Sequence, residues 1–122
     1  YEKKLLKENE IPKLIESIRN SEMNGANVTV PFKNSVIQFL DDLSSDAKKT
    51  NSVNTICKEN DKIIGHNTDI AGFELALKYS KYNVSNKDIL ILGAGGVVPC
   101  IIYAVKKMNV SFKERAESLY GN

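Results

Sequence analysis

The chain has 122 residues, which is enough for one domain with a core of its own. Its composition, with 42% hydrophobic and 26% charged residues, is typical of a soluble globular protein, and no apolar run approaches the roughly 20 residues of a membrane span. The net charge is only +2 and the lysines are spread along the chain, so nucleic acid is not expected as a partner.

The first signals along the chain predict a helix and then a strand. Apolar side chains recur at helical spacing over residues 10–21. The β-branched run Asn27–Val30 predicts a strand, which the following proline ends because it lacks an N–H. Asn27 and Thr29 share one strand face, and Lys33 follows just past its end. This pattern suits a small hydroxylated or carboxylated ligand, although an ordinary solvated strand face has the same pattern.

A β-hairpin is predicted in the middle of the chain. It follows a helix over residues 34–40 and a polar stretch, 41–51, that holds another helical turn. Its arms are two short apolar runs within residues 53–67, joined by a polar turn, and Asn54 lies on the first arm.

The exit of this hairpin is polar and leads into another helix. The segment Gly65–Asp69 precedes a helix predicted over residues 69–82. Thr68 or Asp69 can cap that helix, and capping is the simpler role for Asp69, although a capping carboxylate can also be catalytic. His66 either touches the same site or is an incidental turn residue.

A glycine-rich turn follows the last aliphatic run. Ile89–Leu92 predicts a strand buried on both faces of a parallel sheet, and Gly93–Gly96 then turns the chain into an apolar helix over Val97–Met108. Strand, glycine turn and helix start are the parts of a dinucleotide pyrophosphate site. A glycine turn without a ligand is the alternative, since Val98 stands where the fingerprint has its third glycine or alanine.

Four segments, in order, resemble the motifs of the shikimate dehydrogenase family. They span Gly25 to about Val105, most of the chain. The segments are Asn27–Lys33, similar to the family's substrate motif; Ser52–Thr55, similar to its Ala-Val-Asn-Thr segment; Gly65–Gly72, similar to its Gly-x-Asn-Thr-Asp-x-x-Gly motif; and Gly93–Gly96, similar to its NADP-binding glycine turn.

The resemblance implies reversible reduction of 3-dehydroshikimate to shikimate by NADPH. It implies that Lys33 and Asp69 are the catalytic pair, because hydride transfer leaves negative charge on a ketone oxygen that an ammonium group can protonate. Thr29, Lys33, Asn54 and Asp69 are then the substrate-binding residues, while Asn27 either shares this role or only braces the strand. The implied cofactor-binding residues are Gly93, Ala94, Gly95 and Gly96. The partner is a small molecule, and the protein is expected to be a cytoplasmic monomer or homodimer.

The same resemblance implies an α/β fold with two lobes. The polar segment Lys81–Lys87 is the best linker candidate, so the boundary is predicted near residue 85. Residues 1–85 are expected to form a substrate-binding and catalytic lobe with a mixed sheet. Residues 86–122 are expected to begin a Rossmann-type NADP-binding lobe, with the site in the cleft between the lobes.

The chain departs from the family pattern at both ends. The family's Ser-x-Ser-Pro segment is absent, and Tyr1 is expected to begin partway through an early strand. After the glycine-turn helix, residues 109–111 are too short for a core strand and residues 112–117 indicate a helix. Residues are therefore expected to be missing between Val110 and Lys113.

Two alternatives stay open. A quinate/shikimate dehydrogenase that uses NAD fits the same motifs, because the segment that decides the 2′-phosphate preference is not in the chain. A non-catalytic module that binds nucleotide or sugar acid fits if the natural protein is this short. The mass of the natural polypeptide, near 13.6 kDa or about twice that, separates the module from the enzyme.

The cysteines and the histidine complete the expectations. Cys57 and Cys100 lie far apart, on a predicted strand and a predicted helix, and are expected to be reduced thiols in a reducing compartment. With one histidine and two distant cysteines, the sequence predicts no metal site.

Overall fold

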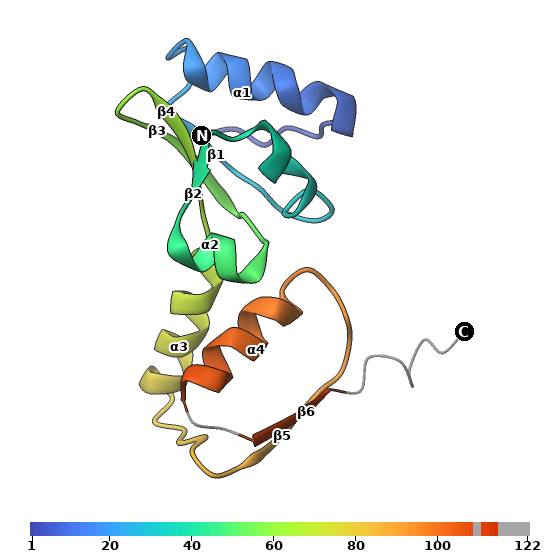
Figure 1. The fold of residues 1–122 in the computed structure, drawn as a ribbon, viewed down its shortest axis with the longest axis vertical. Coiled ribbons are helices and arrows are strands. Elements are labelled where there is room, and N and C mark those ends of the chain that lie inside the picture. Colours follow the sequence, from blue (N-terminus) through green and yellow to red (C-terminus); the bar gives the residue numbers. More distant parts are fainter. Residues whose placement is uncertain (109–110, 115–122) are drawn as a thin grey trace, which may run out of the picture. The chain divides into compact units, whose positions relative to one another are not determined.

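A computed structural model describes residues 1–108 and 111–114 (Figure 1). The chain forms two compact units, Tyr1–Asn67 and Thr68–Asn122. This division lies before the helix α3 (Asp69–Tyr79), whereas the predicted boundary near residue 85 lies after it, because α3 packs against a helix of the second unit. The functions expected of residues 1–85 and 86–122 stay predictions. Within the described ranges, none of the helices is long and apolar enough to cross a membrane.

The first unit is built on a four-stranded mixed sheet with the order β1-β3-β4-β2. Its strands are β1 (Gly25–Asn27), β2 (Asp42–Leu43), β3 (Thr55–Glu59) and β4 (Lys62–His66). β3 and β4 form the predicted hairpin, and both turn residues, Asn60 and Asp61, adopt the positive φ angles that match hairpin twist. β1 runs antiparallel to β3, and β2 runs parallel to β4.

Short helices pack on one face of this sheet. They are α1 (Ile11–Arg19), η2 (Ser35–Phe39) and α2 (Ser45–Thr50), and η1 (Glu8–Glu10) adjoins α1. α1 forms where its apolar period predicted it, with Pro12 in the first turn, where a missing N–H costs little. The α1 isoleucines meet the sheet in the core, whose buried members are Ile11, Ile15, Ile18, Val36, Ala47, Val53, Ile56 and Ile63.

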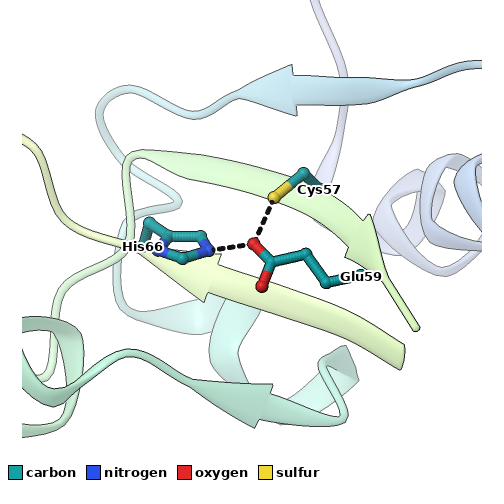
Figure 2. Close-up of side chains that lie close together, drawn as sticks. All are labelled: Cys57, Glu59 and His66. Atoms are coloured by element: carbon teal, nitrogen blue, oxygen red, sulfur yellow. Dashed lines mark hydrogen bonds and ion pairs between the residues drawn. The ribbon is translucent and has the colours of Figure 1, made fainter. Parts of the chain in front are cut away.

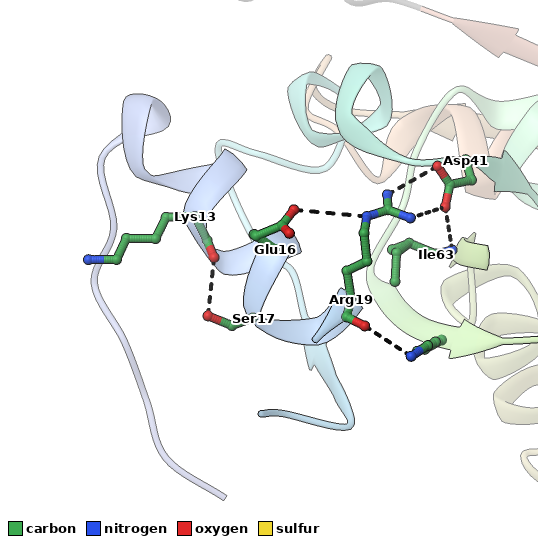
Figure 3. A network of polar contacts seen from close by, with 7 residues as sticks. Lys13, Glu16, Ser17, Arg19, Asp41 and Ile63 are labelled. Carbon is green, nitrogen blue, oxygen red and sulfur yellow. Dashed lines mark hydrogen bonds and ion pairs between the residues drawn. The ribbon is translucent and has the colours of Figure 1, made fainter. Parts of the chain in front are cut away.

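A polar network fastens the end of α1 to the sheet (Figure 3). The Arg19 guanidinium donates to both carboxylate oxygens of Asp41, at 2.9 and 3.1 Å. The Ile63 backbone N–H donates to the same carboxylate at 2.8 Å. The hydrogen bond from Arg19, and then that from Ile63, hold the pKa of Asp41 below its ordinary value.

The strand predicted over Asn27–Val30 lies earlier than expected. The Phe32 N–H donates to the Thr29 carbonyl at 3.0 Å, so the residues between them turn instead of pairing. Regular pairing with β3 therefore ends at Asn27. The early strand expected from Tyr1 is also absent from the described structure, since residues 1–7 pair with no strand.

In the residues that the structure describes, the second unit contains two helices and a parallel strand pair. The helices are α3 (Asp69–Tyr79) and α4 (Val98–Lys107), and the strands are β5 (Asp88–Ile91) and β6 (Ser111–Glu114). α3 and α4 pack through Ile70, Cys100 and Ala104. β5, the glycine turn, α4 and β6 form a βαβ unit of Rossmann type, so the predicted α/β class is confirmed.

Two local predictions for this unit were wrong. The helix predicted over residues 112–117 is a strand over 112–114, because Ile89–Ile91 of β5 supplies parallel pairing partners that local preference cannot reveal. The rest of that prediction, and residues 109 and 110, lie outside the described residues. Leu90 and Leu92 are 55% and 69% exposed, so β5 is not buried on both faces.

Candidate active site

The loop that follows β1 is tied to the entrance of β3 at both of its ends. The Val28 N–H donates to the Asn54 carbonyl at 2.8 Å, and the Val53 N–H donates to the Lys33 carbonyl at 2.7 Å. Thr29 lies on this loop and is exposed, while Lys33 is half-buried. The first unit therefore brings together three of the predicted site residues, Thr29, Lys33 and Asn54.

Both the backbone and the side chain of Asn54 are hydrogen-bonded to neighbouring residues. Its backbone N–H donates to the His66 carbonyl at 3.0 Å, and its Oδ1 accepts a hydrogen bond from Thr55 Oγ1 at 3.1 Å. Asn27, opposite Thr55 in the β1–β3 register, contacts the same hydroxyl through its Nδ2 at 3.3 Å. The contact favours bracing over ligand binding as the role of Asn27.

Asn67 is a buried polar residue with a structural role that its sequence context did not indicate. Its side chain is buried, and its Nδ2 donates to the Ser52 carbonyl at 3.0 Å and lies 3.5 Å from Thr50 Oγ1. The amide therefore ties the chain leaving β4 to the segment that leads into β3. Its neighbours His66, Thr68 and Asp69 are polar too, so the sequence does not indicate that Asn67 is the buried one.

Asp69 lies at the start of α3, the first helix of the second unit. It is half-buried and is the first residue of α3, directly after Thr68 at the N-cap position. Thr68 makes no side-chain capping hydrogen bond, so the cap predicted for it is absent. The pairing of Asp69 with Lys33 stays a prediction.

The glycine turn leads from β5 into α4 with space around its backbone. Gly93 has a φ of +129°, which few other residues adopt, so this position requires glycine. A Cβ atom at Gly93, Gly95 or Gly96 would meet nothing within 4 Å. Val98, where the fingerprint has its third small residue, is buried as the first residue of α4. The turn is therefore open enough for a phosphate to approach its backbone.

These features define an α/β protein with a polar site beside a mixed sheet and a second unit that begins like a dinucleotide-binding domain. The sequence model of the shikimate dehydrogenase substrate binding domain matches residues 1–56. A shikimate dehydrogenase (NADP(+)) of Pelagibacter ubique is 56% identical over 110 residues, which are 90% of this chain and 42% of that protein.

Solved structures agree with this similarity. The shikimate dehydrogenase of Aquifex aeolicus superposes with a TM-score of 0.82 at 38% identity, covering 93% of this chain and 43% of that one. The shikimate 5-dehydrogenase of Thermus thermophilus, solved with NADP(H) and shikimate, superposes with a TM-score of 0.78 at 28% identity, covering 88% and 40%. These matches confirm the predicted resemblance to the shikimate dehydrogenase family over most of the chain, which spans less than half the length of these relatives.

Proposed function

We propose that this chain is part of an NADP-dependent shikimate dehydrogenase, which reversibly reduces 3-dehydroshikimate to shikimate. The observation that carries the proposal is the loop of Thr29 and Lys33, tied by backbone hydrogen bonds to Val53 and Asn54. In the proposed site, the hydroxyl of Thr29, the ammonium of Lys33 and the amide of Asn54 act on one ligand, a set that suits a ring with several hydroxyl groups. The name of the Pelagibacter ubique relative supports the same reaction.

Each residue of the proposed site has a defined task. The Lys33 ammonium donates a proton to the oxygen that gains negative charge when the ketone is reduced, and the Lys33 amine takes that proton back in the reverse direction. The Asp69 carboxylate orients the Lys33 side chain until the transfer. Thr29 and Asn54 bind the ring hydroxyls and so position the ketone.

The glycine turn suits the pyrophosphate of a dinucleotide. Its backbone is unobstructed at Gly93, Gly95 and Gly96, and Ala94 adds only a methyl group. The first turn of α4 adds backbone N–H groups and the positive end of a helix dipole. Bound NADPH would supply the hydride. The chain's own residues hold the phosphates and protonate the product.

The decisive experiment is Lys33→Ala in the natural polypeptide. Loss of a general acid should lower kcat by about 10²–10⁴-fold, while the Kd for NADPH stays near that of the wild type. Lys48→Ala is the matched control, because Lys48 is an exposed lysine of α2 paired with Asp42 at 3.1 Å. Unchanged turnover in Lys33→Ala would remove this residue from the mechanism.

The pairing of Lys33 with Asp69 has its own test. A crystal structure with shikimate should place Lys33 Nζ and a carboxylate oxygen of Asp69 on the same ligand. A structure with the two groups on different sides of the ligand contradicts the pair. Turnover of shikimate and quinate with NADP and with NAD then fixes the substrate and the cofactor.

We also propose that the enzyme works in the cytoplasm as a monomer or homodimer. Cys57 and Cys100 form no disulfide, which suits a reducing compartment. Sedimentation of the natural polypeptide distinguishes the two oligomeric states.

A further inference from the structure

Three side chains of different chemistry converge on one face of the β3–β4 hairpin (Figure 2). Cys57 and Glu59 are two residues apart on β3, so both side chains leave the same face of the strand. His66 lies opposite Thr55, which shares that face, and therefore points to the same side.

The three side chains already hold one another at short range. Glu59 Oε1 accepts a hydrogen bond from Cys57 Sγ at 3.0 Å and lies 2.6 Å from His66 Nε2. All three donor atoms lie within 4.8 Å of one another. A tetrahedral zinc ion with ordinary bond lengths sets such atoms roughly 3.4–3.6 Å apart, so small side-chain movements are enough to admit it.

The backbone beneath the cluster is fixed by the core. Ile56 and Ile63 point to the opposite face of the same two strands and are both fully buried. The neighbouring strand offers only Gly25 opposite Cys57, so no side chain crowds the thiol from that direction. Glu59 and His66 are 48% and 34% exposed, so an ion can reach the cluster from solvent.

We propose that Cys57, Glu59 and His66 bind one divalent cation of the zinc type, with water as the fourth ligand. One thiolate and one carboxylate balance the two positive charges, and a neutral imidazole completes the protein ligands. On binding, the Cys57 thiol loses its proton to solvent and the sulfur–metal bond replaces the sulfur–hydrogen bond.

The donor set selects the class of metal. Sulfur and imidazole nitrogen favour zinc and its neighbours in the transition series, whereas magnesium and calcium prefer oxygen ligands alone. No metal site is predicted from the sequence, because its two cysteines and one histidine are far apart along the chain. The hairpin brings Cys57 and His66 together across two strands and adds the carboxylate of Glu59.

The test is titration of the reduced, tag-free natural polypeptide with Co²⁺ and then Zn²⁺. The imidazole resonance of His66, identified by its loss in His66→Gln, reports ligation by NMR. We expect a thiolate-to-cobalt absorption band at one ion per chain, a shift of the His66 resonance, and displacement of Co²⁺ by Zn²⁺. Mg²⁺ should produce neither signal.

Matched variants assign the ligands. Cys57→Ser should abolish the cobalt band, whereas Cys100→Ala, which removes the other, buried cysteine, should retain it. Glu59→Gln and His66→Gln should each weaken binding by more than the roughly 10–100-fold that follows loss of a residue that only hydrogen-bonds a ligand. Circular dichroism of each variant confirms that the fold is kept.

Three results would overturn the proposal. The first is a Co²⁺ titration of the folded wild-type chain with no thiolate band. The second is a band that survives in Cys57→Ser. The third is a stoichiometry of one ion per two chains, which would assign the metal to cysteines of different molecules.

Discussion

Gly65 and Gly72 belong to the same sequence motif, but the structure predicts that replacement by alanine has opposite effects on stability at the two positions. A Cβ atom at Gly65 would lie 2.6, 2.8 and 2.9 Å from side-chain carbons of Leu40, Val53 and Leu43, where ordinary contacts are 3.4–4 Å. These three packed side chains must therefore shift together to make room for the added methyl group. Overpacking of this kind costs about 1–3 kcal/mol, so Gly65→Ala should destabilise the first unit by that amount.

Gly72 is the internal control for this prediction. It lies in α3, and a Cβ atom there would meet nothing within 4 Å. Alanine is the better helix former by about 0.8–1 kcal/mol, so Gly72→Ala should leave stability unchanged or raise it. The two variants add the same methyl group to the same chain, and only the surroundings differ.

Urea unfolding followed by circular dichroism measures both variants. With a slope of about 2 kcal/mol per molar urea, Gly65→Ala should lower the midpoint by roughly 0.5–1.5 M. Amide hydrogen exchange at Ile63 and Ile70 then shows which unit has lost stability. A folded Gly65→Ala chain with the wild-type midpoint, or an equal loss in Gly72→Ala, refutes the packing argument.

Two further predictions concern charged side chains. Because Arg19 lowers the pKa of Asp41, the folded state gains from this carboxylate above its ordinary pKa of 3.8 and loses the gain as the pH falls through the lowered value. Asp41→Asn should therefore flatten the acid limb of a plot of melting temperature against pH; an unchanged limb counts against the argument. The Glu59 carboxylate, helped by burial, raises the pKa of the Cys57 thiol to about 11, so Glu59→Gln should speed its alkylation at pH 8, with the buried Cys100 as internal reference. An unchanged rate would show that the hydrogen bond does not control the thiol.

The sequence predicted those elements whose signals are local. The helix α1 is encoded by its apolar period, and the β3–β4 hairpin by two short apolar runs with a polar turn between them. The start of α4 follows from Gly93–Gly96 and from Pro99, which is tolerated only in the first turn. Each of these signals needs no knowledge of distant residues.

The missed elements depend on partners elsewhere in the chain. β2 is only two residues long, Asp42 and Leu43, and exists because it pairs in parallel with β4. β6 likewise takes its register from β5, although residues 112–117 alone indicate a helix. Short strands in parallel pairs carry almost no signal of their own, so local reasoning cannot find them.

The candidate site divides in the same way. The sequence motifs singled out Thr29, Lys33 and Asn54, and the backbone hydrogen bonds show how these two segments, far apart in sequence, are held together. The buried amide of Asn67 and the cluster around Glu59 were not predicted, because burial and cross-strand contacts appear only when β3 and β4 pair. A motif thus identifies residue types, while the pairing decides which of them meet.

The hairpin links the two proposals physically. Its one face completes the core, its other face carries the cluster of Cys57, Glu59 and His66, and its open end holds Asn54. The backbone N–H of Asn54 donates to the carbonyl of His66 at 3.0 Å. One backbone hydrogen bond therefore joins a proposed metal ligand to a proposed substrate-binding residue. An ion that fixes His66 is therefore expected to affect Asn54, whose chain neighbour Val53 is hydrogen-bonded to the backbone of Lys33, the proposed proton donor. Turnover is measured with and without Zn²⁺ in wild type and in Cys57→Ser. An effect of bound Zn²⁺ through His66 requires the Cys57 thiol and is lost in Cys57→Ser, whereas the proposed proton transfer by Lys33 does not require it.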